Sequence, residues 1–113
     1  MSKRERDKGK RGERRWAAWF KARGFRVKTT DETGSEGHDE EIGRDLELTD
    51  FEPSLFAQCK ELRANCPSPR GMLERAQIAA VHFTEGSLFT RDIIIMRADV
   101  FDELAAKAAE RSE

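Results

Sequence analysis

Residues 45–60, DLELTDFEPSLFAQCK, contain two short runs in which polar and apolar side chains alternate. The runs cover residues 45–48 and 55–60, and a period of two is typical of β-strands that bury one face. Between the runs, Pro53 lies in a segment with the composition of a turn. The two runs therefore predict an antiparallel hairpin, which forms part of a larger sheet.

This hairpin is expected to bring together side chains that are separated along the chain. Because its turn is centred near Pro53, the start of the first strand meets the end of the second, and Asp45 is placed close to Gln58 and Lys60. Gln58 and Lys60 are two residues apart and share one face of their strand, while Cys59 points the other way into the core. An ordinary half-exposed strand shows the same alternation, so the prediction of a site depends on the hairpin geometry.

The segments on either side of the hairpin predict an α/β domain with a mixed central sheet flanked by helices, in the order α-β-β-β-α-β-β-α. The run Ile93–Met96 is apolar on both faces, which is typical of a buried central strand. Asp99 is a candidate N-cap for the last helix. Outside the hairpin, we expect a helix at 10–23, a strand at 25–29, a helix from 69 or 70 to about 78 or 80, strands at 81–84 and 88–97, and a helix at 100–110.

The length and composition restrict the class of protein. A chain of 113 residues with 38% charged and 37% hydrophobic residues suits one compact domain with a modest core. Apolar runs such as Ile93–Met96 are far too short to span a membrane. Two cysteines, Cys59 and Cys66, make no disulfide framework, and no apolar leader follows the basic start. We therefore expect a cytoplasmic protein without a membrane partner.

The charges are segregated along the chain, although the formal net charge is only -1. Residues 1–28 carry 12 basic and 3 acidic side chains, whereas residues 29–50 carry 9 acidic side chains and one basic side chain. This asymmetry predicts a basic surface for an anionic partner beside an acidic centre; a solvated tail next to a solvated loop is the alternative. We expect residues 1–9 to form a flexible basic arm, with a frayed helical turn as the alternative, and residues 10–113 to form the folded domain.

The first helix carries an acidic residue on its apolar side. Glu13 precedes Trp16 by about one helical turn and Phe20 by about two, so it continues the stripe that faces the core. A carboxylate in that position needs a partner because an unpaired buried charge is costly, although a contact on the helix surface is the alternative. Glu13, Asp45 and the amide of Gln58 together supply the oxygen ligands that Mg²⁺ or Mn²⁺ takes in proteins. Such a metal polarises a phosphate and lowers the pKa of bound water.

Several short motifs occur in an order that is found in one group of nucleases. They are KGKRGE at residues 8–13, an amphipathic helix that ends before Gly24, GRDL at residues 43–46, and QCK at residues 58–60. In this order and spacing, the chain resembles the PD-(D/E)XK nuclease superfamily and, within it, the small Holliday-junction resolvases of archaea and bacteriophages. The resemblance covers about residues 8–102.

This resemblance implies a restriction-endonuclease-like fold and a role for each motif residue. Asp45 would be the principal metal ligand, and Gln58 would take the place of the usual second acid. Lys60 would be the motif lysine, Glu13 the acid carried by the first helix, and the main-chain carbonyl of Cys59 a further metal ligand. The implied cofactor is Mg²⁺, or Mn²⁺ in its place, and the implied product carries a 5′-phosphate.

The chain departs from the family pattern at two positions. Arg44 stands where proline usually precedes the aspartate, and Gln58 replaces glutamate or aspartate, as in the related Mrr-like restriction nucleases. The segment TGSEG at residues 33–37 resembles a resolvase loop with a catalytic hydroxyl, for which Ser35 is the first candidate and Thr33 the second. If Asp45 is not the ligand, one of three neighbouring acids takes its place: Asp39, Glu40 or Glu41.

These features predict a Mg²⁺-dependent endodeoxyribonuclease of prokaryotic or phage origin that binds branched, four-way DNA junctions as a homodimer. Trp16 and Trp19 cannot both lie at the centre of one helix stripe, so one of them can supply a dimer interface. The alternatives are an Mrr-like or DNA-repair nuclease with another substrate, a non-catalytic nucleic-acid-binding domain, and a small interaction module. The expected contacts with the DNA backbone come from basic side chains of the arm and first helix: Lys3, Arg4, Arg6, Lys8, Lys10, Arg11, Arg14 and Arg15.

Overall fold

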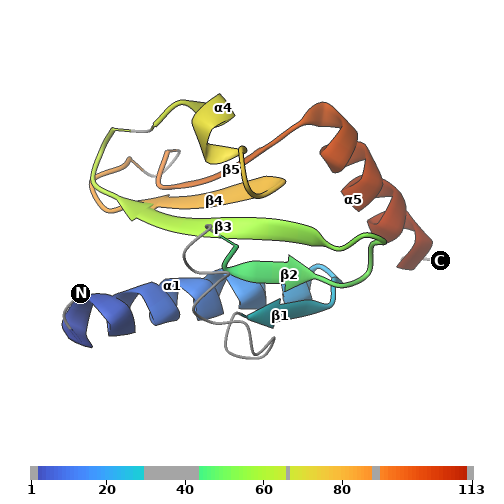
Figure 1. Cartoon of the computed structure of the whole chain (residues 1–113), viewed down its shortest axis with the longest axis horizontal. Coiled ribbons are helices and arrows are strands. Elements are labelled where there is room, and N and C mark those ends of the chain that lie inside the picture. Colours follow the sequence, from blue (N-terminus) through green and yellow to red (C-terminus); the bar gives the residue numbers. More distant parts are fainter. Residues whose placement is uncertain (1–2, 30–43, 66, 88–89, 112–113) are drawn as a thin grey trace.

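The computed structural model describes residues 3–29, 44–65, 67–87 and 90–111, with side chains described between residues 11 and 110 of these ranges. In this part of the chain, helices and strands follow the predicted order α-β-β-β-α-β-β-α, so the expectation of an α/β domain is confirmed (Figure 1). The elements are α1 (Lys3–Ala22), β1 (Val27–Thr29), β2 (Leu46–Leu48), β3 (Leu55–Leu62), α4 (Pro69–Met72), β4 (Ile78–Phe83), β5 (Asp92–Met96) and α5 (Ala98–Arg111).

The described strands form one mixed sheet in the order β1-β2-β3-β4-β5. Strands β3 and β4 are parallel and are connected through α4, whereas the other neighbouring strands are antiparallel. The predicted hairpin is β2–β3, in which Leu46 lies opposite Ala57 and Leu48 opposite Leu55. The sheet is therefore mixed, as expected, and the second strand of the hairpin, β3, is its middle strand.

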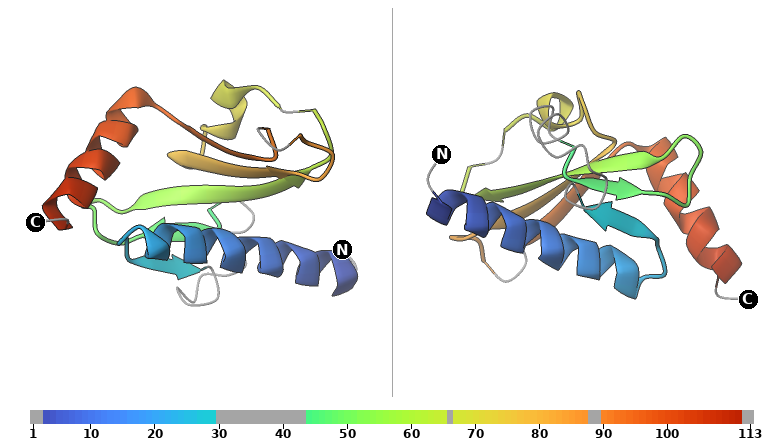
Figure 2. Two further views of the ribbon diagram at one scale, coloured as in Figure 1. Left: turned by 180° about the vertical axis from the view of Figure 1, so that it is seen from behind. Right: turned by 60° about the horizontal axis from the view of Figure 1, so that its bottom comes forward.

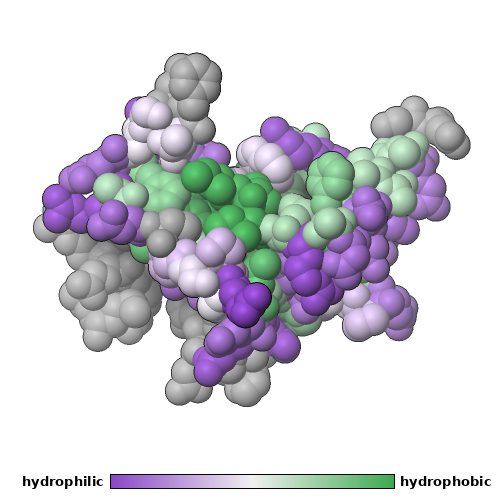
Figure 3. Space-filling view, turned by 90° about the horizontal axis from the view of Figure 1, so that it is seen from above, coloured by the Kyte–Doolittle hydropathy of each residue, from purple (hydrophilic) through white to green (hydrophobic). Residues whose placement is uncertain are grey.

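The helices lie on different sides of this sheet (Figures 1 and 2). Helix α1 runs along one face, where Trp16 and Phe20 join a large apolar cluster built from β1 to β4 and from α5. Helix α4 lies over the other face, where Met72 packs with a smaller cluster that includes Val81 and Phe83. Viewed from the side of α4, an apolar area is visible on the surface (Figure 3), and the cluster on this face has half-buried members such as Ile93.

Two expectations about the second half of the chain are wrong. The helix expected to reach residue 78 or 80 ends at Met72, because the alanines that suggest a helix belong to the buried strand β4, where Ala79 and Ala80 have no exposed surface. The run Ile93–Met96 lies in β5, which is an edge strand rather than a central one. The pattern of apolar residues within one segment cannot show which strands are central. The order of the strands depends on pairing between distant segments.

The helix boundaries also differ from those expected. Helix α1 begins at Lys3 rather than near Lys10, so the stretch expected to be an arm continues the helix; lysine, arginine and glutamate are good helix formers. It ends as predicted near Gly24, whose φ of 92° is favourable for glycine. Helix α5 begins at Ala98, so Asp99 lies in its first turn rather than at its cap. No helix in the described ranges is both long enough and apolar enough to cross a membrane.

Candidate active site

Asp45 lies at the point where the pairing between β2 and β3 ends. Its main-chain N–H donates to the carbonyl of Ala57 at 3.0 Å, and its side-chain Oδ2 accepts a hydrogen bond from the N–H of Cys59 at 2.8 Å. Strand β2 begins at Leu46, which pairs with Ala57 of β3. The carboxylate of Asp45 therefore satisfies an amide of β3, that of Cys59, which lies beyond the part of β3 paired with β2. The acidic side chain is thereby attached directly to the backbone of the strand that carries Gln58 and Lys60.

Glu13 is the second carboxylate, and α1 places it against the sheet. It is 9% exposed and lies one helical turn from the buried Trp16, which confirms that it continues the core-facing stripe. Because α1 packs on the same face as the large apolar cluster, a charged group at this position faces the interior rather than the solvent.

Cys59 lies within the electrostatic reach of both carboxylates. Burial is the main cause that raises the pKa of its thiol well above 9.0, and the negative charges of Asp45 and Glu13 raise it further. The residue also packs against the large cluster, as expected for a side chain that points into the core. The two carboxylates, which come from different elements, are therefore brought together around one residue of β3.

Gln58 and Lys60 lie on either side of Cys59 along β3, and both are half-buried. Continuing the hairpin register by one residue beyond Leu46 places Asp45 opposite Gln58, as predicted. Since successive side chains of a strand alternate, Gln58 and Lys60 project toward the face opposite the Cys59 thiol. Asp45 and Glu13 thus act on Cys59, whereas the side chains of Gln58 and Lys60 lie on the other face of β3, so the structure brings together only part of the predicted set.

The donor set suits a hard divalent cation. Two carboxylates, those of Asp45 and Glu13, are close to Cys59, and the carbonyl of Cys59 and the amide of Gln58 belong to the same stretch of strand. Mg²⁺ is commonly bound through one or two carboxylates, with water and phosphate oxygens completing its octahedron. Across the described residues, no group of three or more His, Cys, Asp and Glu side chains is arranged to hold a metal ion.

A scan against protein-family models, a search of curated proteins and a search of solved structures each gave no match. The nuclease resemblance of the short motifs therefore remains a hypothesis.

The structure also shows a group of contacts beside Asp45 that sequence reasoning did not predict. The Nε–H of Arg44 donates to the main-chain carbonyl of Arg75 at 3.0 Å, and its guanidinium carbon lies 4.6 Å from the centre of the Phe56 ring. Gln77 holds the same segment, because its N–H donates to the carbonyl of Phe56 and its Oε1 accepts from the N–H of Phe56. The only sequence signal was the arginine in place of the usual proline.

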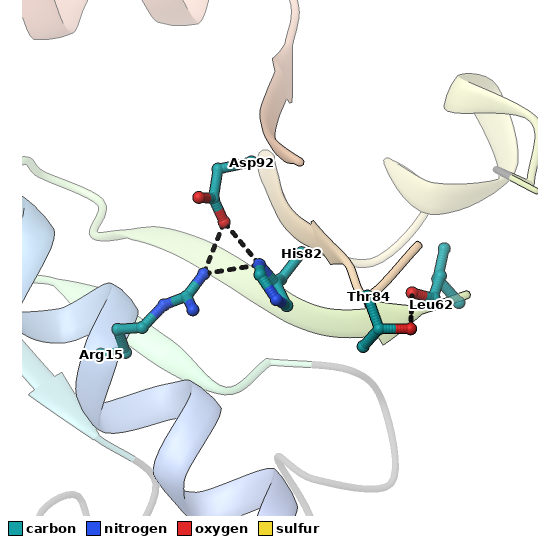
Figure 4. A network of polar contacts seen from close by, with 5 residues as sticks. All are labelled: Arg15, Leu62, His82, Thr84 and Asp92. Carbon is teal, nitrogen blue, oxygen red and sulfur yellow. Dashed lines mark hydrogen bonds and ion pairs between the residues drawn. The ribbon is translucent and has the colours of Figure 1, made fainter. Parts of the chain in front are cut away.

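Arg15 makes contacts that compete with its predicted role at DNA. Its Nη2 donates to Asp92 Oδ1 and lies 2.9 Å from His82 Nδ1, and His82 and Asp92 are 2.8 Å apart (Figure 4). This network connects α1 with β4 and β5. Arg11 and Arg14 are likewise exposed on α1.

Several predicted residues lie outside the described part of the chain. They include both hydroxyl candidates, the three alternative acids and the side chains of the first five predicted DNA contacts: Ser35, Thr33, Asp39, Glu40, Glu41, Lys3, Arg4, Arg6, Lys8 and Lys10. Predictions for these residues are unaffected by the geometry described above.

Proposed function

We propose that this protein is a metal-dependent DNA endonuclease with a restriction-endonuclease-like fold, and that it resolves four-way junctions. The observation that carries the proposal is that Asp45, immediately before β2, and Glu13, in α1, both act on Cys59, which lies between Gln58 and Lys60. Helix α1 and the residue before β2 supply two carboxylates, and β3 supplies an amide and an ammonium group. This combination suits hydrolysis of a phosphodiester.

Each residue has a distinct proposed role. Asp45 and Glu13 would hold Mg²⁺, with the carbonyl of Cys59 and the amide of Gln58 as further oxygen ligands. The bound metal would supply a polarised phosphate and a more acidic water. Lys60 would orient the attacking water or stabilise the negative charge that develops on the phosphate. Arg11 and Arg14, which are exposed on α1, would bind the DNA backbone.

Cleavage assays on junction, duplex, flap and single-stranded DNA with Mg²⁺, Mn²⁺ or EDTA test the proposal. We expect cleavage only with a metal, and loss of at least about 10²-fold in rate for Asp45→Asn and for Lys60→Ala, because each removes a group that stabilises developing charge. Glu61→Gln is the matched control, since Glu61 is an exposed residue on the same strand. We expect this control to cut at the wild-type rate.

The variants also distinguish the proposal from its main alternative. Gln58 in place of an acid favours a second candidate, a nucleic-acid-binding domain without catalysis. Junction binding without cleavage under any metal condition would support that alternative. Full activity of a folded Asp45→Asn variant would instead show that the reaction takes place at a different site. Cleavage of duplex or flap DNA without preference for junctions would favour an Mrr-like or repair nuclease.

A further inference from the structure

We propose that Arg44 is a positioning residue for Asp45 at the candidate site. It would fix the residues before β2 by contacting Phe56 of β3 and Arg75, which lies in the segment that leads into β4. The role in metal binding and catalysis rests on the proposed function, but the anchoring itself does not. Arg44 immediately precedes the aspartate whose carboxylate accepts the hydrogen bond from Cys59.

The contacts of Arg44 include a hydrogen bond and a stacking contact with an aromatic ring. Its Nε–H donates to the carbonyl of Arg75 at 3.0 Å, and its guanidinium carbon lies 4.6 Å from the centre of the Phe56 ring. A guanidinium satisfies both contacts at once because it is planar and carries donors in its plane. The half-buried side chain of Arg44 therefore connects the entrance of β2 with β3 and with the segment that leads into β4.

The two groups that Arg44 contacts, the Phe56 ring and the Arg75 carbonyl, belong to segments that are hydrogen-bonded to their neighbours. Phe56 is paired with Glu47 of β2, and its main-chain N–H and carbonyl are both bonded to Gln77. Arg75 lies two residues before Gln77, so its carbonyl belongs to the same short connection. Arg44 is consequently attached to a part of the molecule that is bonded directly to the central strands.

Asp45 is held between this anchor and β3. On one side the chain is fixed at Arg44, and on the other the N–H of Asp45 is bonded to Ala57 while its carboxylate is bonded to Cys59. Leu46, Glu47 and Leu48 pair with β3 on one side and with β1 on the other, and Asp45 lies immediately before this paired stretch. Loss of the anchor is expected to loosen the bond between Asp45 and Cys59, and a displacement of about 1 Å at a reacting centre can cost about 10²-fold in rate.

The direct test is hydrogen exchange at the amide of Cys59, measured by nuclear magnetic resonance on the full chain without metal or DNA. In Arg44→Ala we expect this amide to exchange at least about tenfold faster, while the amide of Val81 in β4 keeps its wild-type rate. Arg44→Lys retains the charge but not the planar group, so it is expected to behave like Arg44→Ala. Phe56→Leu removes only the ring and is expected to have a smaller effect in the same direction.

A second measurement connects the anchor with the site. Isothermal titration with Mn²⁺ is expected to show about 10- to 100-fold weaker binding for Arg44→Ala, which is the usual effect of losing a residue that orients a metal ligand. Arg63→Ala is the matched control, because Arg63 is an exposed arginine that pairs with Glu85 and does not contact the site. This control is expected to bind Mn²⁺ like the wild-type protein.

The two measurements separate a failure of the anchor from a failure of the proposed function. Unchanged Cys59 exchange in a folded Arg44→Ala variant, or wild-type exchange in Arg44→Lys, would overturn the positioning role. If the wild-type protein neither binds Mn²⁺ nor cleaves DNA, the proposed function is wrong, while faster Cys59 exchange in Arg44→Ala would still establish the anchor. Unchanged Mn²⁺ affinity together with faster exchange would overturn the link between the anchor and the metal.

Discussion

Cys59 is the residue on which the two carboxylates of the candidate site act together. Its N–H is bonded to Asp45, and the charges of Asp45 and Glu13 add to burial in raising the pKa of its thiol. A thiol in these surroundings remains protonated and is a poor nucleophile. The side chain of Cys59 therefore serves packing, while its main chain provides the polar groups of the site.

The raised pKa of the Cys59 thiol predicts that stability decreases in alkaline solution. Above about pH 9 the thiol of the unfolded chain loses its proton while the folded thiol keeps it, so the unfolded state binds fewer protons. The free energy of unfolding should then fall by up to about 1.4 kcal/mol per pH unit until the folded thiol also ionises. Urea unfolding between pH 8 and 10, in a Cys66→Ser background, measures this slope.

Two comparisons control this experiment. Cys59→Ala in the same background should lose this part of the slope, and an identical slope would show that the thiol does not cause it. Asp45→Asn and Glu13→Gln should each lower the pKa of the Cys59 thiol, because each removes a negative charge. Faster alkylation of Cys59 by iodoacetamide at a fixed alkaline pH would show that shift.

Helix α1 combines two functions on its different faces. Trp16 and Phe20 are buried against the sheet, whereas Arg11 and Arg14 are exposed. Arg15 is also partly exposed, but Asp92 partly neutralises it and attaches this part of the helix to β5. The basic residues of one helix should therefore contribute unequally to DNA binding.

We expect the double variant Arg11→Ala and Arg14→Ala to weaken binding to junction DNA and to make it less sensitive to salt. If each arginine neutralises one phosphate, the slope of log affinity against log salt should become shallower by about 1.8. Fluorescence anisotropy with labelled junction DNA over a range of salt concentrations measures the slope. Arg97→Ala is the control, since Arg97 pairs with Asp99 beside α5, and an equal effect there would indicate only a change in net charge.

The contacts of Arg15 lead to a separate prediction. Asp92→Asn removes the carboxylate that neutralises Arg15, so it should increase affinity for DNA at low salt. The same change should lower thermal stability slightly, because exposed ion pairs contribute about 0.2–1 kcal/mol. Anisotropy and thermal unfolding of this variant test both effects, and weaker DNA binding with unchanged stability would contradict the assigned contact.

The whole molecule leaves apolar surface exposed on more than one side. On the face of α4, the small cluster has half-buried members such as Ile95, and Figure 3 shows an apolar area on that side. Elsewhere, Trp19 is 36% exposed and Phe101 is 58% exposed. Contiguous apolar surface of this kind is typical of interaction sites, although single exposed residues are ordinary.

We expect the protein to form a homodimer, because the resolution of a four-way junction needs two opposed cuts and one domain has one candidate site. Light scattering at micromolar concentration, with and without junction DNA, should give twice the mass of the 12.9 kDa chain. A strict monomer in both conditions would contradict the prediction. A dimer that nicks only one strand would instead contradict junction resolution.

Local patterns in the sequence determined the hairpin, its approximate register and the inward position of Glu13. A period of two along 45–48 and 55–60, with a turn between them, is enough to predict the hairpin, and the structure pairs Leu46 with Ala57 and Leu48 with Leu55. A helical period is likewise enough to place Glu13 on the buried stripe of α1. Both depend on geometry that repeats within a few residues, which is why one sequence is sufficient to predict them.

Only the tertiary structure decided which strands are central and which charged side chains are paired. The apolar run in β5 became an edge strand, while the alanine-rich β4 took the interior position. In the same way, the contacts of Arg15 with His82 and Asp92, and of Arg44 with Phe56 and Arg75, join segments far apart in the chain. Such pairings depend on how the elements pack together, and no periodicity within a single segment contains that information.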